Sequence, residues 1–551
     1  MINITNKSKK IYEWLDLLNN NPSSFLTYIE EDYLNDKDIF NSEKELFRDA
    51  LKYSEKVFGA NETVAIIRIP GRVNLLGMHI DHRMGSVNPI ATHSMLMVIQ
   101  PRGDDQIHIY NCNPIFKSRS FSINELLPEE KIYDWDTWTK QNLQKRIAEK
   151  KSEDWSNYFQ ASALYLQNYV KKEKKRNFTK ISGFNAVIKS SIPYSAGLSS
   201  SSSLVVGCAI ALMTINNIHL TNEEFIDFCG SAEWYVGTRG GKGDHAAMYI
   251  SKKGKISHIS FNPFSVIYAP FPKNYCIALC NSIVSATKIA GARSRFNAGV
   301  ANYEIGFLLL KKFFPQFSDK IKYLRDITPE RLNINESEIY SMIKSLPEKI
   351  TRNELIKLYP EYNESWEKNF STHEEPIEGY WVRDASLFGI TECIRSEKAV
   401  EFLRKGNVIK FGELMNISHN GDRVTQIKNG KRISYRTRAT DELINSLINK
   451  ISIEKDNELY KLYNQPGWYG MSCPELDELV DISSISEGVA GARLVGAGMG
   501  GCVAVLIDKD YVKKFIKKVS DLYYKPKNLF SAIEICFPVD GTGFIEDKTT
   551  S

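Results

Sequence analysis

The sequence predicts a globular protein of mixed helices and strands with at least two domains. Its 551 residues are enough for two or more sizeable hydrophobic cores. Hydrophobic residues make up 42% of the chain and charged residues 25%, as in ordinary globular proteins. Strand and helix patterns follow one another closely. Residues 183–190 carry apolar side chains at alternate positions, and the apolar run 204–213 fits a buried helix.

The composition argues against several classes of protein. A net charge of +5 is small for this length and gives no reason to expect a nucleic-acid partner. The nine cysteines are scattered, without zinc or redox spacing, which favours reduced thiols in a cytoplasm. No span approaches transmembrane length, and residues 1–7 lack an apolar signal region. We therefore expect a cytoplasmic protein with no membrane contact.

The segments outside the motifs predict further helices and strands. Residues 1–41 contain helical pieces broken at 19–22 and carry no recognisable chemistry. A helical pattern from residue 42 leads into a strand at 64–69. Other expected elements are an exposed helix at 134–151, strands at 256–260 and 275–280, an amphipathic helix at 383–395, and a helix near 472 that Ser472 and Glu475 would cap.

The stretch 193–204 is the feature around which the chemistry is organised. It is a loop of small residues that separates the strand at 183–190 from the apolar helix. Such a loop leaves backbone N–H groups unpaired at a helix N-terminus, where the helix dipole adds partial positive charge. The loop therefore predicts a phosphate cradle, although a serine-rich surface loop fits the same residues. It is not a Walker P-loop, because no G-x-x-x-x-G-K-[ST] occurs.

A second cluster of polar residues follows the strand at 64–69. The sequence from Pro70 to His82 collects Arg72, His79 and Asp81 around two glycines at a strand exit, where functional groups are often displayed. The spacing of His79 and His82 matches no known zinc pattern, so it gives little support for a metal site.

A third cluster lies at 232–245. Asp244 sits in a glycine-rich turn with Gly241, where backbone can approach a ligand closely. An aspartate that orders its own turn is the alternative interpretation.

The last motif is the glycine-rich run at 491–502. Its G-x-G-x-G-G pattern invites a dinucleotide-binding interpretation, which needs a helix directly after the glycines. Residues 503–507 read as a strand instead, so that interpretation fails. The glycines concerned are Gly496, Gly498, Gly500 and Gly501.

These motifs resemble those of the GHMP small-molecule kinases, and within them the galactokinase branch. The segment P-G-R-V-N-L-L-G-M-H-I-D-H resembles the branch pattern P-G-R-V-N-L-I-G-E-H-x-D-Y, and P-x-x-x-G-L-S-S-S and the glycine run follow in the family order. The resemblance implies two α+β domains, a ribosomal-protein-S5-like one and a ferredoxin-like one, with the active site in the cleft between them. We expect an extension at 1–41, domains at 42–272 and 273–551, and a helical insertion near 313–376.

The resemblance also implies roles for particular residues. Asp244 would be the catalytic base, with Arg72 beside it, and Ser201 and Glu233 would hold Mg²⁺. Gly496, Gly498, Gly500 and Gly501 would let their loop pack close to the phosphate loop. The expected ATP-binding residues are Gly197, Leu198, Ser199, Ser200, Ser201 and Ser202, and the expected sugar-binding residues are His79, Asp81, Met78, Gly241 and Phe296.

The implied activity is phosphorylation of the anomeric hydroxyl of an aldose by Mg-ATP. Met78 replaces a glutamate, Phe296 a tyrosine and His245 a glutamine of the galactokinase pattern. The first two changes indicate a sugar that differs from galactose near C6. A catalytically silent sugar and ATP sensor, and a kinase for a non-sugar alcohol, are the alternatives. No oligomeric state follows from the sequence.

Overall fold

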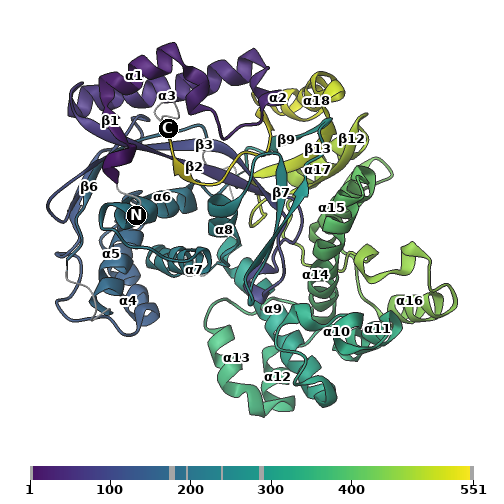
Figure 1. Ribbon diagram of the computed structural model, residues 1–551. Coiled ribbons are helices and arrows are strands. Elements are labelled where there is room, and N and C mark those ends of the chain that lie inside the picture. The colour runs from purple at the N-terminus through teal and green to yellow at the C-terminus, as the bar shows by residue number, and fades with distance from the viewer. Residues whose placement is uncertain (1–3, 173–179, 194–196, 238–239, 285–290, 547–551) are drawn as a thin grey trace.

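The computed structural model describes residues 4–172, 180–193, 197–237, 240–284 and 291–546. It contains two larger β-sheets, one built mainly by each half of the chain, with helices packed on both (Figure 1). The predicted α+β class with two structural units is confirmed.

The first sheet has seven strands and is mostly antiparallel. Strand β2 carries residues 63–69 and the start of the motif at 70–82, and it pairs with β3 on one side and with β1 and β15 on the other. Among the strand pairs in the described ranges, β4 and β6 alone run parallel. In sheet order the strands are β1 (Ser8–Lys10), β2 (Thr63–Asn74), β3 (Pro89–Pro101), β6 (Phe184–Ser190), β4 (Gln106–Asn111) and β5 (Arg119–Ser122), with β15 (Gly543–Phe544) beside β2.

Helices cover both faces of this sheet. Successive side chains at 64–67 of β2 are apolar and point to opposite faces, so each face needs a helical layer to bury it. Val64 and Ile66 pack with the first helices of the chain, whereas Ala65 and Ile67 face the opposite helical layer. Figure 1 shows α1 and α3 above the sheet and α6 below it. The helices of this half are α1 (Ile11–Asn20), α2 (Glu31–Leu34), α3 (Lys37–Phe58), α4 (Trp135–Ala148), α5 (Asn157–Lys172), α6 (Ser200–Ile215), α7 (Asn222–Glu233) and α8 (Gly243–Ile250).

The second sheet has four antiparallel strands. Helices α15 and α17 pack on it, and a separate hairpin of β7 and β8 precedes it in the chain. The strands are β12 (Val489–Leu494), β13 (Cys502–Asp508), β9 (Tyr275–Asn281) and β14 (Ile533–Cys536), with β7 (Lys255–Ser260), β8 (Ser265–Pro270) and the small hairpin β10 (Thr425–Lys428) and β11 (Lys431–Ser434) outside the sheet.

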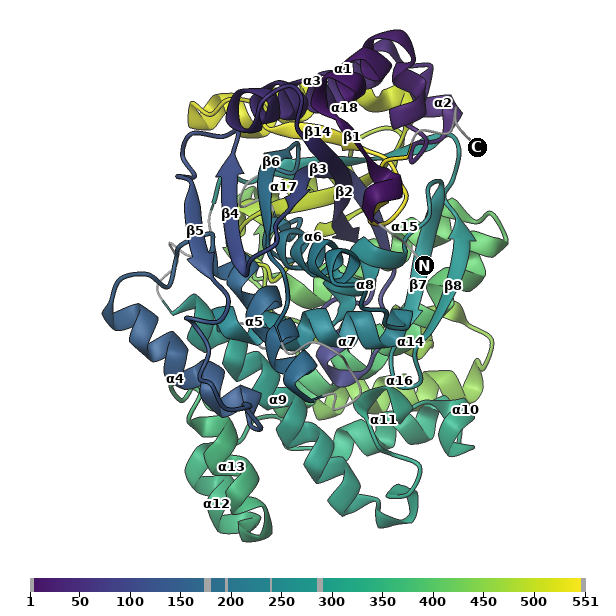
Figure 2. The same ribbon diagram turned by 60° about the vertical axis from the view of Figure 1, so that its left-hand side comes forward.

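The remaining helices of the second half form a largely helical region away from α1 and α3 (Figure 2). The predicted insertion at 313–376 falls here and is helical. The helices of this region are α9 (Ala292–Phe313), α10 (Pro329–Leu332), α11 (Glu336–Ser345), α12 (Arg352–Leu358), α13 (Asn363–Phe370), α14 (Val382–Arg404) and α16 (Asp441–Ile453). The second half also contains α15 (Val408–Asp422) and α17 (Pro474–Ser484), which pack on the second sheet, and α18 (Val512–Val519), which contacts α17.

Three observations bear on the local predictions. In the described part of the predicted extension at 1–41, β1 pairs with β2 and α1 packs on the first sheet. The chain end at β15 also returns to the first sheet, although it follows the second. Ser472 does not cap α17: Cys473 is the N-cap residue, and Ser472 is buried and donates its backbone N–H to Asp422.

None of the helices described is long and apolar enough to cross a membrane.

Candidate active site

Arg72 and Asp244 form the centre of the site, although 172 residues separate them. Arg72 lies near the end of β2 and Asp244 in the first turn of α8. The Arg72 Nε and Nη2 atoms donate to the two carboxylate oxygens of Asp244 at 2.6 and 2.7 Å. Arg72 Nη1 also donates to the carbonyl of Gly197 at 2.5 Å. The guanidinium is nearly buried, so this bidentate pair has a fixed geometry beside the phosphate loop.

The phosphate loop places unpaired backbone donors next to this pair. Ser199 precedes α6 with a left-handed φ of 56°, donates its hydroxyl to Asp244 and makes no side-chain cap bond to the helix. Across the described residues, the backbone N–H groups of Ser200, Ser201 and Ser202 have no acceptor. Three free donors at the start of a 16-residue helix are suited to phosphate oxygens. Residues 194–196 of the predicted motif lie outside the described residues.

The glycine-rich loop packs directly on the phosphate loop. A Cβ atom on Gly197 would lie 3.2 Å from the carbonyl oxygen of Val495, and one on Gly496 would lie 3.4 Å from the carbonyl of Gly197. Both glycines have left-handed φ values, 78° and 77°. The expected approach of the two loops is therefore seen at Gly496. Of the other predicted glycines, Gly498 packs against Met471, and Gly500 and Gly501 lead into β13.

Glu233 lies beside the first turn of α6, as a magnesium ligand there requires. Its oxygens accept hydrogen bonds from Ser202 Oγ at 3.1 and 3.2 Å, whereas Ser201, the predicted partner, makes no such contact in the part of the chain that is described. His245 Nε2 lies 2.7 Å from the same carboxylate. Burial lowers the pKa of His245, but the carboxylates of Glu233 and Asp244 outweigh burial and raise it. Serine and glutamate oxygens fit the hard cation Mg²⁺.

Asp81 and Gly241 meet at the predicted sugar site. A Cβ atom on Gly241 would lie 2.0 Å from Asp81 Oδ2, so only glycine lets the turn before α8 approach this carboxylate. His79 lies in the same loop as Asp81, and its ring packs against Tyr469 with the centroids 4.9 Å apart. Residues from both halves of the chain therefore surround this loop.

Met78 and Phe296 have mainly apolar surroundings. Met78 is 5% exposed and packs among apolar residues of the second sheet and α17. Phe296 is half-buried on α9 and packs against the core of the helical region. Within the described ranges, no ring contact or hydrogen bond joins either residue to Asp81 or Gly241.

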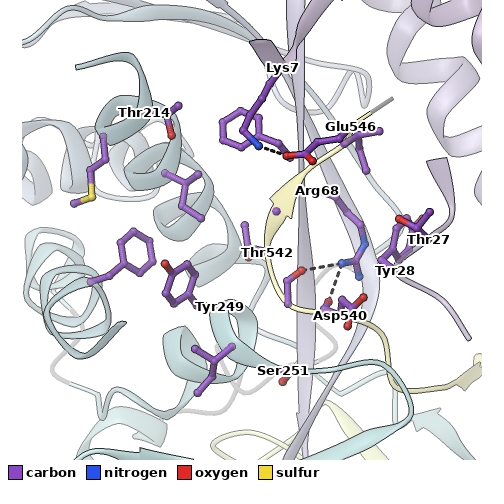
Figure 3. A pocket seen from close by; sticks show the side chains of 18 of the residues that line it. Lys7, Thr27, Tyr28, Arg68, Thr214, Tyr249, Ser251, Asp540, Thr542 and Glu546 are labelled. Carbon is purple, nitrogen blue, oxygen red and sulfur yellow. Dashed lines mark hydrogen bonds and ion pairs between the residues drawn. The ribbon is translucent and has the colours of Figure 1, made fainter. Parts of the chain in front are cut away.

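A cavity of about 740 Å³ lies elsewhere, between β2, the C-terminal end of α6 and residues 540–546 (Figure 3). Arg68, Tyr249 and Asp540 are among its lining residues. None of the predicted site residues contributes to it, so it is not the cleft that the family resemblance implies.

Comparison with known protein families gives three matches along the chain. The model for the GHMP kinases N terminal domain matches residues 157–252, and that for GHMP kinases C terminal matches residues 457–525. The galactokinase galactose-binding signature matches residues 55–101. These ranges include the phosphate loop, Asp244, the glycine-rich run and the loop of Arg72, His79 and Asp81.

Similar proteins cover nearly the whole chain. The galactokinase of Fusobacterium nucleatum is 26% identical over 91% of this chain and 100% of its own, and that of Dictyostelium discoideum is 24% identical over 88% and 89%. The crystal structure of Lactococcus lactis galactokinase complexed with galactose matches with a TM-score of 0.60 at 21% identity, covering 89% of this chain and 98% of that one, which shows a shared fold. The chain thus carries the N-terminal and C-terminal GHMP kinase domains together with the galactokinase galactose-binding signature, and it is galactokinase-like.

Proposed function

We propose that this protein transfers the γ-phosphoryl group of Mg-ATP to the anomeric hydroxyl of an aldose. The observation that carries the proposal is the bidentate pair of Arg72 and Asp244, beside the backbone N–H groups of Ser200 to Ser202, which have no acceptor among the described residues. The galactokinases similar to this chain support a sugar as the acceptor.

Phosphoryl transfer depends mainly on positioning and on neutralising phosphate charge. The N–H groups of Ser200 to Ser202 would bind phosphate oxygens of ATP. Asp244 would align the sugar hydroxyl and accept its proton as the oxygen bonds to phosphorus and ADP leaves. Arg72 fixes the orientation of that carboxylate.

Glu233 and a serine hydroxyl of the first turn of α6 would hold Mg²⁺. Ser202 contacts Glu233, and Ser201 remains the serine predicted from the sequence. When bound, Mg²⁺ supplies positive charge to the phosphate oxygens of ATP.

The proposed sugar resembles galactose in its ring but differs near C6. The galactose-binding signature at 55–101 supports a galactose-like ring. Met78 and Phe296, however, lack the carboxylate and the hydroxyl that the galactokinase pattern has there. A buried substrate hydroxyl left without a partner costs about 1–3 kcal/mol. A 6-deoxy sugar, a heptose or another modified aldose avoids this cost.

The test is ADP release from Mg-ATP against galactose, fucose, arabinose, glucuronate, heptoses and N-acetylhexosamines. We expect one sugar altered at C6 to exceed galactose in kcat/KM by about tenfold or more. Equal turnover of galactose and all its C6 variants would contradict this choice of sugar. Tight binding of a sugar without any turnover would instead favour the silent sensor.

Measuring turnover with this panel of sugars tests the proposed substrate better than the variant Met78→Glu does. Met78 is 5% exposed among apolar side chains. A carboxylate at this position would be buried, with the Asn74 amide, now 3.3 Å from Met78 Sδ, as its nearby donor, so we expect that variant to lose stability rather than to gain galactose turnover.

A further inference from the structure

A buried ionic network joins the loop after β2 to the second half of the chain. Its members are Glu392 on α14, Asp422 at the end of α15 and Arg493 on β12, and each is 0% exposed. Charged side chains are rarely buried to this extent unless they are paired. Their contacts therefore show what the network holds in place.

Glu392 holds the backbone of the loop. Its Oε1 atom accepts the N–H groups of Gly77 at 2.9 Å and Met78 at 3.1 Å. Its Oε2 atom accepts from Arg395 Nη1 at 2.7 Å. Burial raises the pKa of Glu392, but the charges of Arg395 and Arg493 outweigh burial and lower it. An ionised carboxylate with backbone donors fixes the peptide next to His79 to α14.

Asp422 lies between Arg493 and the imidazole of His79. Asp422 Oδ1 is 3.5 Å from His79 Nε2, and Asp422 Oδ2 is 3.5 Å from Arg493 Nη2. Arg493 Nη1 lies 3.4 Å from Glu392 Oε1, which completes a chain of contacts from α14 to His79.

The contact between Asp422 and His79 leaves buried polar atoms without ideal hydrogen bonds. His79 Nε2, Asp422 Oδ2 and Arg493 Nη2 are buried and have no hydrogen-bond partner within the described parts of the chain. Such atoms are few in native proteins, and each calls for an explanation. One explanation is that these charged residues hold His79 in position for a ligand. Selection for stability alone would favour apolar side chains at these buried positions.

The rest of the surroundings restricts His79 as well. Its backbone adopts a left-handed φ of 60°, and its ring lies between Tyr469 and Phe388, with centroids 4.9 and 6.4 Å away. His79 is 8% exposed, so its ring has little room to turn. The carboxylate of Asp422 lies 3.5 Å from its Nε2 atom.

We propose that Asp422 is a positioning residue for sugar binding, which orients the imidazole of His79 while Arg493 and Glu392 keep Asp422 and the loop in register. This proposal rests on the proposed function, because it assumes that His79 contacts the sugar. Asp422 acts through His79 and does not touch the substrate.

The test is Asp422→Asn, assayed with the best sugar of the panel. Asparagine keeps the shape but removes the charge that faces His79, so we expect the sugar KM to rise by about tenfold or more. The KM for ATP should change by less than about twofold, because the phosphate loop is untouched. An unchanged sugar KM, or an equal rise in both KM values, would overturn the proposal.

A double variant separates positioning from general destabilisation. In a His79→Ala background, Asp422→Asn should change the sugar KM by less than about twofold, because its effect passes through His79. The matched control is Asp326→Asn, which alters another fully buried aspartate, in the helical region, and should leave the sugar KM unchanged. If Asp422→Asn raised the sugar KM as much in the His79→Ala background as in the wild type, the assigned role would be refuted.

Two further measurements apply if Asp422→Asn does not fold or if the wild-type protein has no kinase activity. If Asp422→Asn does not fold, Arg493→Lys keeps the charge but loses the planar fork, and it should raise the sugar KM selectively. An unchanged sugar KM in that variant overturns the proposal. If the wild-type protein phosphorylates no sugar, the proposed function has failed. Calorimetric sugar affinities of wild type and Asp422→Asn then test the positioning role, and equal affinities reject it.

Discussion

Replacing Asp244 with asparagine is expected to lower kcat for sugar phosphorylation by about 100-fold or more. Asparagine keeps the size of the side chain but cannot accept the proton of the attacking hydroxyl. It also loses the paired bonds from Arg72 Nε and Nη2, which now fix the carboxylate at 2.6 and 2.7 Å. Steady-state ADP release with saturating sugar and Mg-ATP measures the loss.

A matched control for this variant exists on the surface of the same protein. Arg102 donates to both oxygens of Asp104, each at 2.6 Å, in an exposed pair of the same geometry. Asp104→Asn breaks that pair and should change kcat by less than about twofold, because exposed pairs contribute little. Comparable activities of Asp244→Asn and Asp104→Asn would remove Asp244 from the mechanism.

Replacing Arg72 with lysine is expected to lower kcat by about 100- to 1,000-fold. The guanidinium makes three contacts, two with Asp244 and one with the carbonyl of Gly197, and so joins the catalytic carboxylate to the phosphate loop. A lysine ammonium keeps the charge but cannot reproduce this planar fork. Single-turnover measurements with bound sugar and ATP report the step directly.

The control for this variant is Arg102→Lys, which removes the planar guanidinium from the exposed pair of Arg102 and Asp104. We expect it to retain wild-type kcat, and thermal unfolding should show that Arg72→Lys is still folded. A variant at Arg72 that raises KM but leaves kcat unchanged would mean that Arg72 contributes only to substrate binding, contrary to the role assigned here.

Much of the site could be predicted from the sequence because its parts lie in short motifs with their own turn chemistry. Arg72 follows a strand, Ser199 opens a helix and Asp244 sits in a glycine-rich turn, and each pattern indicates a functional position by itself. The family resemblance then predicts that Arg72 and Asp244 meet. Their ion pair joins segments 172 residues apart in the sequence.

The network behind His79 could not be predicted in the same way. Charged residues on helices usually face solvent, so the segment 383–395 predicted an amphipathic helix. In the structure α14 is buried on most sides, and Glu392 and Arg395 are 0% exposed. Burial of a charge depends on partners that arrive from distant segments, such as Arg493, and no local pattern reports them.

The serine that faces Glu233 was also beyond prediction. Successive residues of a helix point in directions about 100° apart, so the choice between Ser201 and Ser202 depends on where α6 begins. Helix ends cannot be located to one residue from a sequence. The structure starts α6 at Ser200 and turns Ser202 toward Glu233.

The most direct test of the central claim is proton-coupled phosphorus NMR of the product made from Mg-ATP and the preferred sugar. We predict a phosphomonoester whose phosphorus couples to a single anomeric proton, because the account assigns transfer to the C1 hydroxyl. A three-bond coupling of the phosphorus to a proton at any other carbon of the sugar, or ADP release without a phosphorylated sugar, would contradict it.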